Sequence, residues 1–238
     1  MKKILSLLIV LVLCFTFLPV RVNAEIGGEL ADNGENIELL YKNAKSNNVQ
    51  SNNTTAKLTS ENGKTIDVDV YEIPQLSTYS NDGNTHTVVC VTALNKSMFD
   101  EIKTYSSVTK EDDDGTYVYG KLVCTYTKLK AGSGYQDRYL LTKVNGSWTV
   151  KTYQITLSNR RVAYTCQSAS NLSATAFKYP SSNTFSYNTG FKKYAEDVYG
   201  SWVAAQMNVT CKRGTGSWKF NLYNTIIDRS PKLSDLFS

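Results

Sequence analysis

Histidine is nearly absent from this chain, because only one of its 238 residues, His86, is a histidine. A Ser-His-Asp or Cys-His catalytic arrangement would therefore have to be built around His86. Cys90 follows it by four residues, which on a β-strand separates the two by about 13 Å at the usual rise per residue. The sequence therefore predicts no catalytic residue, and an ordinary strand position for His86.

Closely spaced metal ligands are also lacking. No two cysteines stand two to four residues apart, and a single histidine cannot complete a zinc site. The acidic run Glu111–Asp114 lacks the first ligand of an EF-hand loop, because Lys110 stands there, and no glutamate closes the loop. Gly214-Thr215-Gly216 has no following helix, so it predicts no phosphate-binding loop. We expect neither a metal nor a cofactor.

Long apolar runs occur only at the start of the sequence. Lys2 and Lys3 precede the apolar run 4–20, and Val22-Asn23-Ala24 closes the segment. This order of basic, apolar and small residues predicts a secretory signal peptide over residues 1–24, cleaved after Ala24. The run is short for a transmembrane anchor. We therefore expect a secreted, extracellular protein.

The part of the chain that follows the predicted signal peptide has nearly equal numbers of basic and acidic residues. The whole sequence has 26 basic and 21 acidic side chains and a formal net charge of +5. Removal of Lys2, Lys3 and Arg21 would leave 23 basic residues and a net charge of +2. So small an excess gives no reason to expect a nucleic-acid partner.

Four cysteines remain after signal-peptide cleavage, and an even number in an exported chain predicts two disulfides. Three pairings are open. We favour Cys90 with Cys124 and Cys166 with Cys211, because strands that follow each other in sequence tend to lie side by side. Each bond would contribute about 2–4 kcal/mol to stability.

Apolar and polar residues alternate along much of the chain, and this alternation predicts β-strands over most of residues 64–238. The clearest case is Val203–Cys211, which predicts a strand with one buried face. Asn145-Gly146 is a strong hairpin signal, since both positions tolerate positive φ. Apolar spacings of three and four predict one short helix over residues 96–106, with Ser97 as its N-cap. The expected fold is mostly β, either an antiparallel β-sandwich or two packed β-meanders.

Two regions follow the signal peptide. Residues 25–63 are rich in Asn, Ser and Thr and carry too little apolar surface to offset the entropy of ordering, so they predict a flexible tether. The apolar residues of 37–41 leave two alternatives open there, one or two helical turns or a docking strand. Residues 64–238 are predicted to be the β domain, either as one unit or subdivided at 64–166 and 167–238.

The three tryptophans, Trp148, Trp202 and Trp218, all lie in the tripeptide Gly-Ser-Trp. In addition, Val118-Tyr119-Gly120 is echoed by Val198-Tyr199-Gly200. Internal duplication of a β-meander is one hypothesis for this repetition. The other is that Gly-Ser precedes an aromatic strand residue wherever hairpins are common. A structure in which Trp148 and Trp218 occupy unrelated positions would exclude the first hypothesis.

Tyrosine is abundant, with 16 copies. Rows of aromatic side chains on a sheet can stack on sugar rings or contact a protein partner, although ordinary cross-strand pairing also uses them. The predicted aromatic binding surface consists of Tyr117, Tyr119, Tyr153 and Trp202. We therefore expect a non-catalytic protein that binds a glycan or a protein at the cell exterior.

Two other function classes stay open on the sequence alone. An extracellular hydrolase needs two carboxylates about 5–10 Å apart in a cleft. The candidates by residue type are Asp67, Asp69, Glu72, Asp137, Glu196 and Asp197. A membrane-active β toxin needs about 9–11 alternating residues in each strand of an inserting hairpin. Val203–Cys211 meets that condition, whereas Trp218–Ile227 alternates poorly.

Overall fold

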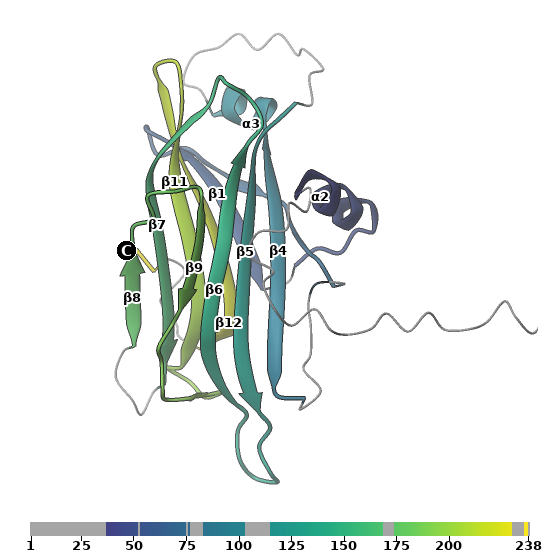
Figure 1. Ribbon diagram of the computed structural model, residues 1–238, viewed down its shortest axis with the longest axis vertical. Helices are drawn as coiled ribbons and strands as arrows, with labels where there is room; N and C mark the ends of the chain where they lie inside the picture. Colours follow the sequence, from purple (N-terminus) through teal and green to yellow (C-terminus); the bar gives the residue numbers. More distant parts are fainter. Residues whose placement is uncertain are drawn as a thin grey trace, which may run out of the picture. The chain divides into compact units, whose positions relative to one another are not determined.

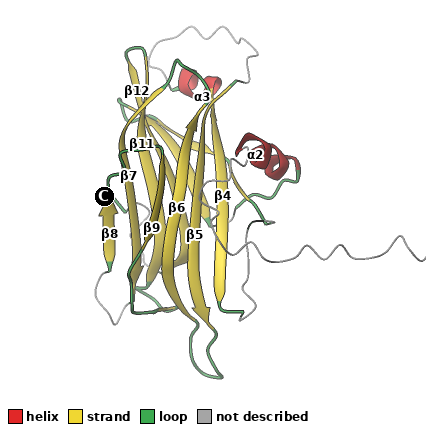
Figure 2. Cartoon of the chain, viewed as in Figure 1, coloured by secondary structure: helices red, strands yellow, loops and turns green. Residues whose placement is uncertain are grey.

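Antiparallel strands dominate the computed structural model, which describes residues 37–51, 53–74, 76, 83–102, 115–168, 174–229 and 236–237. They form two six-stranded sheets that share one core (Figure 1; Figure 2). The predicted mostly β fold and its sandwich form are thereby confirmed. The predicted signal peptide, the start of the predicted tether and the acidic run 111–114 lie outside the described residues.

Each sheet is named here after a central strand. The β11 sheet has the order β2 (Thr65–Val68), β1 (Thr54–Ser60), β12 (Gly216–Asp228), β11 (Trp202–Arg213), β7 (Thr156–Gln167) and β8 (Thr175–Lys178). The β5 sheet has the order β10 (Ala195–Glu196), β6 (Arg138–Val150), β5 (Thr116–Leu129), β4 (Thr85–Asn95) and β3 (Val70–Glu72). β9 (Thr184–Asn188) also pairs with β6.

The core lies between the sheets and consists of the side chains that both sheets point inward. Phe220 on β12 and Gly120 on β5 show how closely the sheets approach, since a Cβ atom on Gly120 would lie 2.9 Å from the Phe220 ring. Leu122 and Leu222, from opposite sheets, are completely buried. Each such aliphatic side chain stabilises the fold by about 1.5–3 kcal/mol relative to exposure.

The predicted short helix is confirmed over its first part as α3 (Lys96–Glu101), which follows β4 at one end of the sandwich (Figure 1), and residues 103–106 of the predicted range lie outside the described residues. Its N-cap is Asn95 with an extended backbone, and the predicted N-cap Ser97 lies inside the helix. Phe99 is completely buried and its ring meets the Trp218 ring edge-on, with 5.1 Å between ring centroids. The helix therefore covers one end of the core.

The predicted tether is wrong from residue 37 on, and of the two alternatives for residues 37–41 the helical one is confirmed. α2 (Ile37–Ser46) lies on the outer face of the β5 sheet, where Tyr41 contacts the rings of Tyr71 and Tyr119. β1 comes from the same predicted tether and lies between β2 and β12. Burial on existing sheets supplies the apolar contacts that this stretch lacks by itself. No helix in the described ranges is both long and apolar enough to cross a membrane.

The predicted hairpin at Asn145-Gly146 is wrong, because both residues lie inside the continuous strand β6. Gly146 is needed there for close packing and not for a turn. A Cβ atom on Gly146 would lie 2.5 Å from the ring of Phe185 on β9 and 2.6 Å from the backbone oxygen of Lys121. Glycine in a strand often marks such a close approach of neighbours.

All four described cysteines are buried free thiols, which corrects the prediction of two disulfides. The strand register explains why Cys166 and Cys211 do not meet. Cys166 pairs with Val203, and Cys211 lies eight residues further along β11, on the order of 26 Å at the usual rise. The prediction that the two strands, β7 and β11, lie side by side is correct, but the two thiols lie at opposite ends of this strand pair.

Cys90 and Cys124 lie closer together, on the adjacent strands β4 and β5, but they are diagonal neighbours because Cys90 pairs with Leu122. Diagonal positions are about 7–8 Å apart, beyond the usual separation of disulfide-bonded residues. Cys90 instead accepts a hydrogen bond from the side-chain amide of Asn224 at 3.3 Å and lies 3.1 Å from the Thr54 hydroxyl.

The repeated motifs have different surroundings. Val118-Tyr119-Gly120 lies within β5, whereas Val198-Tyr199-Gly200 forms a turn in which Gly200 has a φ of 87°. Trp148 lies near the end of β6 against Phe185, while Trp218 lies near the start of β12. The duplication hypothesis therefore gains no support from the local structure of either motif.

β11 is confirmed as a strand, but its expected exposed face is buried. Trp202 through Val209 are all buried, including Gln206 and Asn208 on the outer face of the sheet. Leu236 is one of the residues that cover this outer face. The outer face of the β11 sheet therefore differs from an ordinary solvated sheet face, and it carries the candidate site.

Candidate functional site

The four predicted aromatic binding residues do not share a surface. Tyr119 is buried under α2, and Tyr117 packs beside Phe99 of α3 with 6% of its surface exposed. Trp202 is buried as well, and only Tyr153 is exposed, in the turn between β6 and β7. This prediction is therefore corrected, because covering layers that the alternation does not reveal bury three of the four rings.

Three of the acidic residues considered for hydrolysis lie in ion pairs, and one of these is Asp67, at 3.9 Å from Nζ of Lys57. Asp137 lies 2.8 Å from Nζ of Lys128, and Asp197 lies 2.7 Å from Nε of Arg229. The Lys128 contact and the hydrogen bond from the Ala131 N–H lower the pKa of Asp137, whereas a general acid needs a raised pKa. Within the described ranges no group of three or more His, Cys, Asp and Glu could hold a metal.

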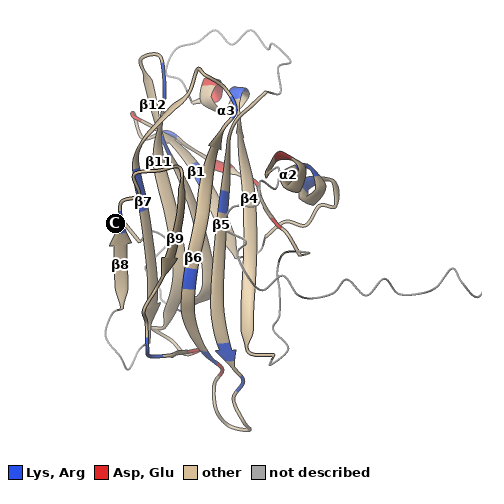
Figure 3. Ribbon diagram, in the orientation of Figure 1, with Lys and Arg blue, Asp and Glu red and all other residues tan. Residues whose placement is uncertain are grey.

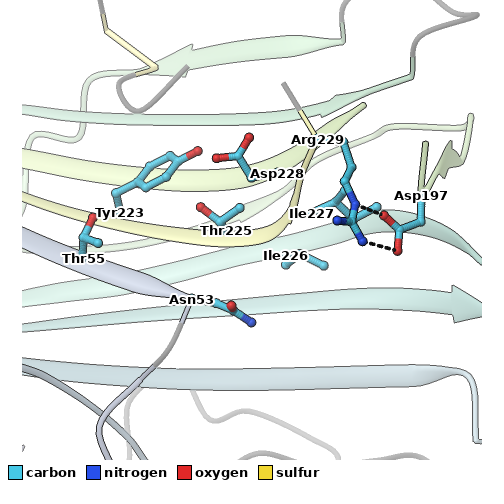
Figure 4. A pocket seen from close by; sticks show the side chains of 9 residues that line it. All are labelled: Asn53, Thr55, Asp197, Tyr223, Thr225, Ile226, Ile227, Asp228 and Arg229. Carbon is cyan, nitrogen blue, oxygen red and sulfur yellow. Dashed lines mark hydrogen bonds and ion pairs between the residues drawn. The ribbon is translucent and has the colours of Figure 1, made fainter. Parts of the chain in front are cut away.

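One pocket of about 450 Å³ opens beside the end of β12 (Figure 4). The ion pair of Arg229 and Asp197 lies at one side of it, and Asn53 lies at another. The Tyr223 hydroxyl in its lining accepts a hydrogen bond of 2.6 Å from the Trp202 indole. The Arg229 guanidinium in this pocket is already neutralised by the Asp197 carboxylate. The pocket is therefore a weaker candidate for a ligand site than the second concave region, on the outer face of the β11 sheet.

A second concave region, the basic groove, lies on the outer face of the β11 sheet. Its volume of about 650 Å³ lies within the range common for ligand sites. Strands β7, β11 and β12 and the segment after β8 contribute to it. The lining residues are Asn159, Arg160, Arg161, Tyr179, Pro180, Asn208, Thr210 and Lys219.

Antiparallel register brings these distant residues together. Asn208 on β11 pairs with Arg161 on β7, and Thr210 pairs with Lys219 on β12. The register between β7 and β11 shifts between Asn208 and Thr210, where Asn159 has a φ of 51°. Such a bulge changes the direction of neighbouring side chains, so both arginines that follow Asn159 reach the groove.

Two buried donors in the groove have no hydrogen-bond partner among the described residues. They are Nδ2 of Asn208, a residue with only 2% of its surface exposed, and Nε of Arg161. A buried donor without an acceptor costs about 1–3 kcal/mol, so folded proteins contain few of them. The groove therefore favours a ligand that presents acceptor oxygens.

Positive charge dominates the groove. Arg160, Arg161 and Lys219 line it, and its described lining includes no carboxylate. β7 carries two arginines and no acidic residue, as the blue on this strand in Figure 3 shows. Nε of Arg160 donates a hydrogen bond of 2.8 Å to Oδ1 of Asn183, which orients its guanidinium. An oriented guanidinium can bind a carboxylate or sulfate through two parallel hydrogen bonds.

Aromatic rings lie beside these donors. Tyr179 lines the groove with 70% of its surface exposed, and Phe177 on the adjacent β8 is 47% exposed. An exposed ring next to polar groups suits contact with the apolar face of a sugar ring. The groove thus combines cationic donors, a neutral amide and an aromatic surface.

The sequence pattern did not predict the basic groove. Its residues come from four separate stretches, and the small net charge predicted for the mature chain, +2, hides a local group of three cations. One local signal was present, because Arg160-Arg161 is a pair of adjacent basic residues directly after Ser158-Asn159, which lie in β7 where its register with β11 shifts. Only the strand register shows which residues join this pair.

Comparison with known proteins gives no family. The chain matches no protein-family model, and neither a curated protein nor a solved structure matches it. The function is therefore argued from the geometry and charge of the groove.

Proposed function

We propose that this protein is secreted and binds an acidic polysaccharide in the basic groove without catalysing a reaction. The observation that carries the proposal is the pair of buried donors on Asn208 and Arg161 that lack a partner among the described residues. Carboxylate or sulfate oxygens are acceptors and carry the charge that complements the three cations. A neutral sugar would satisfy the donors but would leave these cations without a counter-charge.

The lining also favours a sugar polymer over a small inorganic anion. Tyr179 supplies a stacking surface, and Asn159 and Thr210 supply polar contacts for hydroxyl groups. A hydrogen bond to a charged acceptor contributes about 1.5–3 kcal/mol, and two of them correspond to a dissociation constant on the order of 1 mM. Further contacts along a polymer would strengthen binding through several linked sites. The other expectation from the sequence, a protein partner, has no separate observation in its favour.

The test is calorimetric titration of the chain lacking residues 1–24 with polygalacturonate, dextran sulfate and unsubstituted dextran. We expect binding of the two acidic polymers, weakened as salt rises from about 0.05 M to about 0.5 M because ions screen the exposed charges. The double variant Arg160→Gln/Lys219→Gln should lower the affinity at least about tenfold, which corresponds to 1.4 kcal/mol.

The matched control is Lys121→Gln/Lys143→Gln, which removes the same charge from β5 and β6 of the other sheet. It should change the affinity by less than about twofold, a free-energy difference of about 0.4 kcal/mol. Equal losses in the two double variants would show that net charge alone governs binding. Failure of both acidic polymers to bind would contradict the proposal outright.

A further inference from the structure

Leu236 and Phe237 lie on the outer face of the β11 sheet. Leu236 is buried, with 6% of its surface exposed, in a cluster with Ala163, Trp202, Ala204 and Tyr223. These residues come from β7, β11 and β12, the same three strands that contribute to the basic groove. The apolar cluster and the groove are therefore neighbours on one sheet face.

A short hydrogen-bond chain fixes Leu236 in this position. Its backbone N–H donates to Oε1 of Gln206 at 2.6 Å, and Nε2 of Gln206 donates to Oδ1 of Asn221 at 2.7 Å. Gln206 is completely buried. These two hydrogen bonds explain why a long polar side chain can lie in the middle of β11. Asn221 is in turn the register partner of Asn208, one of the two donors in the groove.

Phe237 contacts the other donor directly. The guanidinium carbon of Arg161 lies 4.2 Å from the centre of the Phe237 ring, in a cation-π contact. Phe177 packs on the same ring with 6.0 Å between centroids. A guanidinium held against a ring has fewer accessible rotamers, so less entropy is lost when it binds an anion.

We propose that Leu236 and Phe237 are positioning residues for the basic groove, in which Phe237 holds Arg161 and Leu236 holds Gln206 and Asn221 beside Asn208. This role rests on the proposed function. Neither residue lines the groove, so both act on the ligand through the side chains that they contact. The ring of Phe237, and not only its apolar volume, is what orients the cation.

The test compares Phe237→Leu with Phe237→Tyr in the same chain, titrated with polygalacturonate and dextran sulfate. Leucine keeps apolar volume but has no ring, and it should weaken binding by about 3–10-fold through loss of the cation-π contact. Tyrosine keeps the ring and should restore affinity to within about twofold of the native chain. Phe191→Leu is the matched control, since it makes the same change at a partly buried ring that contacts Tyr164 and not Arg161 or Phe237, and its affinity should stay near native.

A readout without ligand accompanies the titration. The Nε–H resonance of Arg161 should shift between the native chain and Phe237→Leu, because the ring lies against the guanidinium, and it should stay in place in Phe191→Leu. A role that is only structural predicts equal affinities for Phe237→Leu and Phe237→Tyr at matched melting temperatures, and that result would overturn the proposal. If the native chain binds neither acidic polymer, the proposed function fails and this role fails with it. Native binding with unchanged affinity in Phe237→Leu rejects the positioning role alone.

Discussion

Asn208 is the residue on which the functional proposal most depends. The alternation of Val203–Cys211 correctly places it on the face opposite the core, as an expected solvated polar residue. The structure instead buries it, with Nδ2 lacking a partner among the described residues. The reason was invisible in the local sequence, because its register partner Arg161 lies 47 positions earlier in the chain.

Gly146 offers a test of packing at a single atom. Gly146→Ala should destabilise the fold by about 1–3 kcal/mol, because the added methyl group overlaps Phe185 and the fixed backbone oxygen of Lys121. Urea unfolding measures this free energy directly. Gly132→Ala is the control, since a Cβ atom there meets nothing within 4 Å. Equal stability of the two variants would show that β9 does not pack on Gly146 in this way.

The buried thiols give a second prediction at this scale. Burial raises the pKa of Cys211 to about 12 and also raises the pKa of Cys124, and only the thiolate reacts rapidly. In the chain lacking residues 1–24, and so lacking Cys14, a thiol reagent at about pH 8 should therefore react very slowly while the chain is folded. After unfolding in denaturant it should react with four thiols. Detection of fewer than four thiols in the unfolded, unreduced chain would mean that disulfides form.

Among the elements, those predicted correctly depend on patterns within one stretch. α3 and β11 both follow from the spacing of their own apolar residues. The errors arise where distant parts decide the outcome. Asn145-Gly146 has the composition of a turn, but Phe185 from β9 lies over it and the strand continues. The stretch 37–46 lies in a region that is rich in Asn, Ser and Thr, yet the outer face of the β5 sheet gives its apolar residues a surface on which to fold.

The attachment of α2 gives a prediction about acid. The Glu38 carboxylate lies 2.8 Å from Nζ of Lys42 and 3.0 Å from Nζ of Lys151, which follows β6. These hydrogen bonds, that with Lys42 first, lower the pKa of Glu38 below its ordinary value of 4.5. Because the pKa is lower in the folded chain, the contact stabilises the protein above about pH 4.5 and is lost as the pH falls below that value.

The measurement is the melting temperature of Glu38→Gln and of the native chain as a function of pH. The variant should melt lower than the native chain near neutral pH, and the difference should disappear in acid as Glu38 becomes protonated. Glu61→Gln, in the exposed turn between β1 and β2, is the control and should show no such pH-dependent difference. A constant difference at all pH values would assign the effect to the substitution rather than to ionisation.

At the scale of the whole molecule, the sequence predicts the architecture better than the function. A two-layer β fold follows from repeated alternation, because amphipathic strands have to bury one face against another sheet. The basic groove does not follow from composition, since its three cations come from β7 and β12 in a chain whose predicted mature charge is only +2. Its formation depends on sheet order, on a bulge beside Asn159 and on the packing of Leu236 and Phe237 next to it.

The central claim is that an acidic sugar polymer occupies the basic groove, and nuclear magnetic resonance can test its location directly. In a titration of the isotope-labelled chain with galacturonate oligosaccharides, the side-chain amide signals of Asn208 and the Nε–H signal of Arg161 should shift progressively and saturate together, because both donors gain an acceptor. Tyr153, on an exposed turn away from the groove, should be unaffected. Unchanged signals from Asn208 and Arg161 during a titration that shifts other residues would contradict the account.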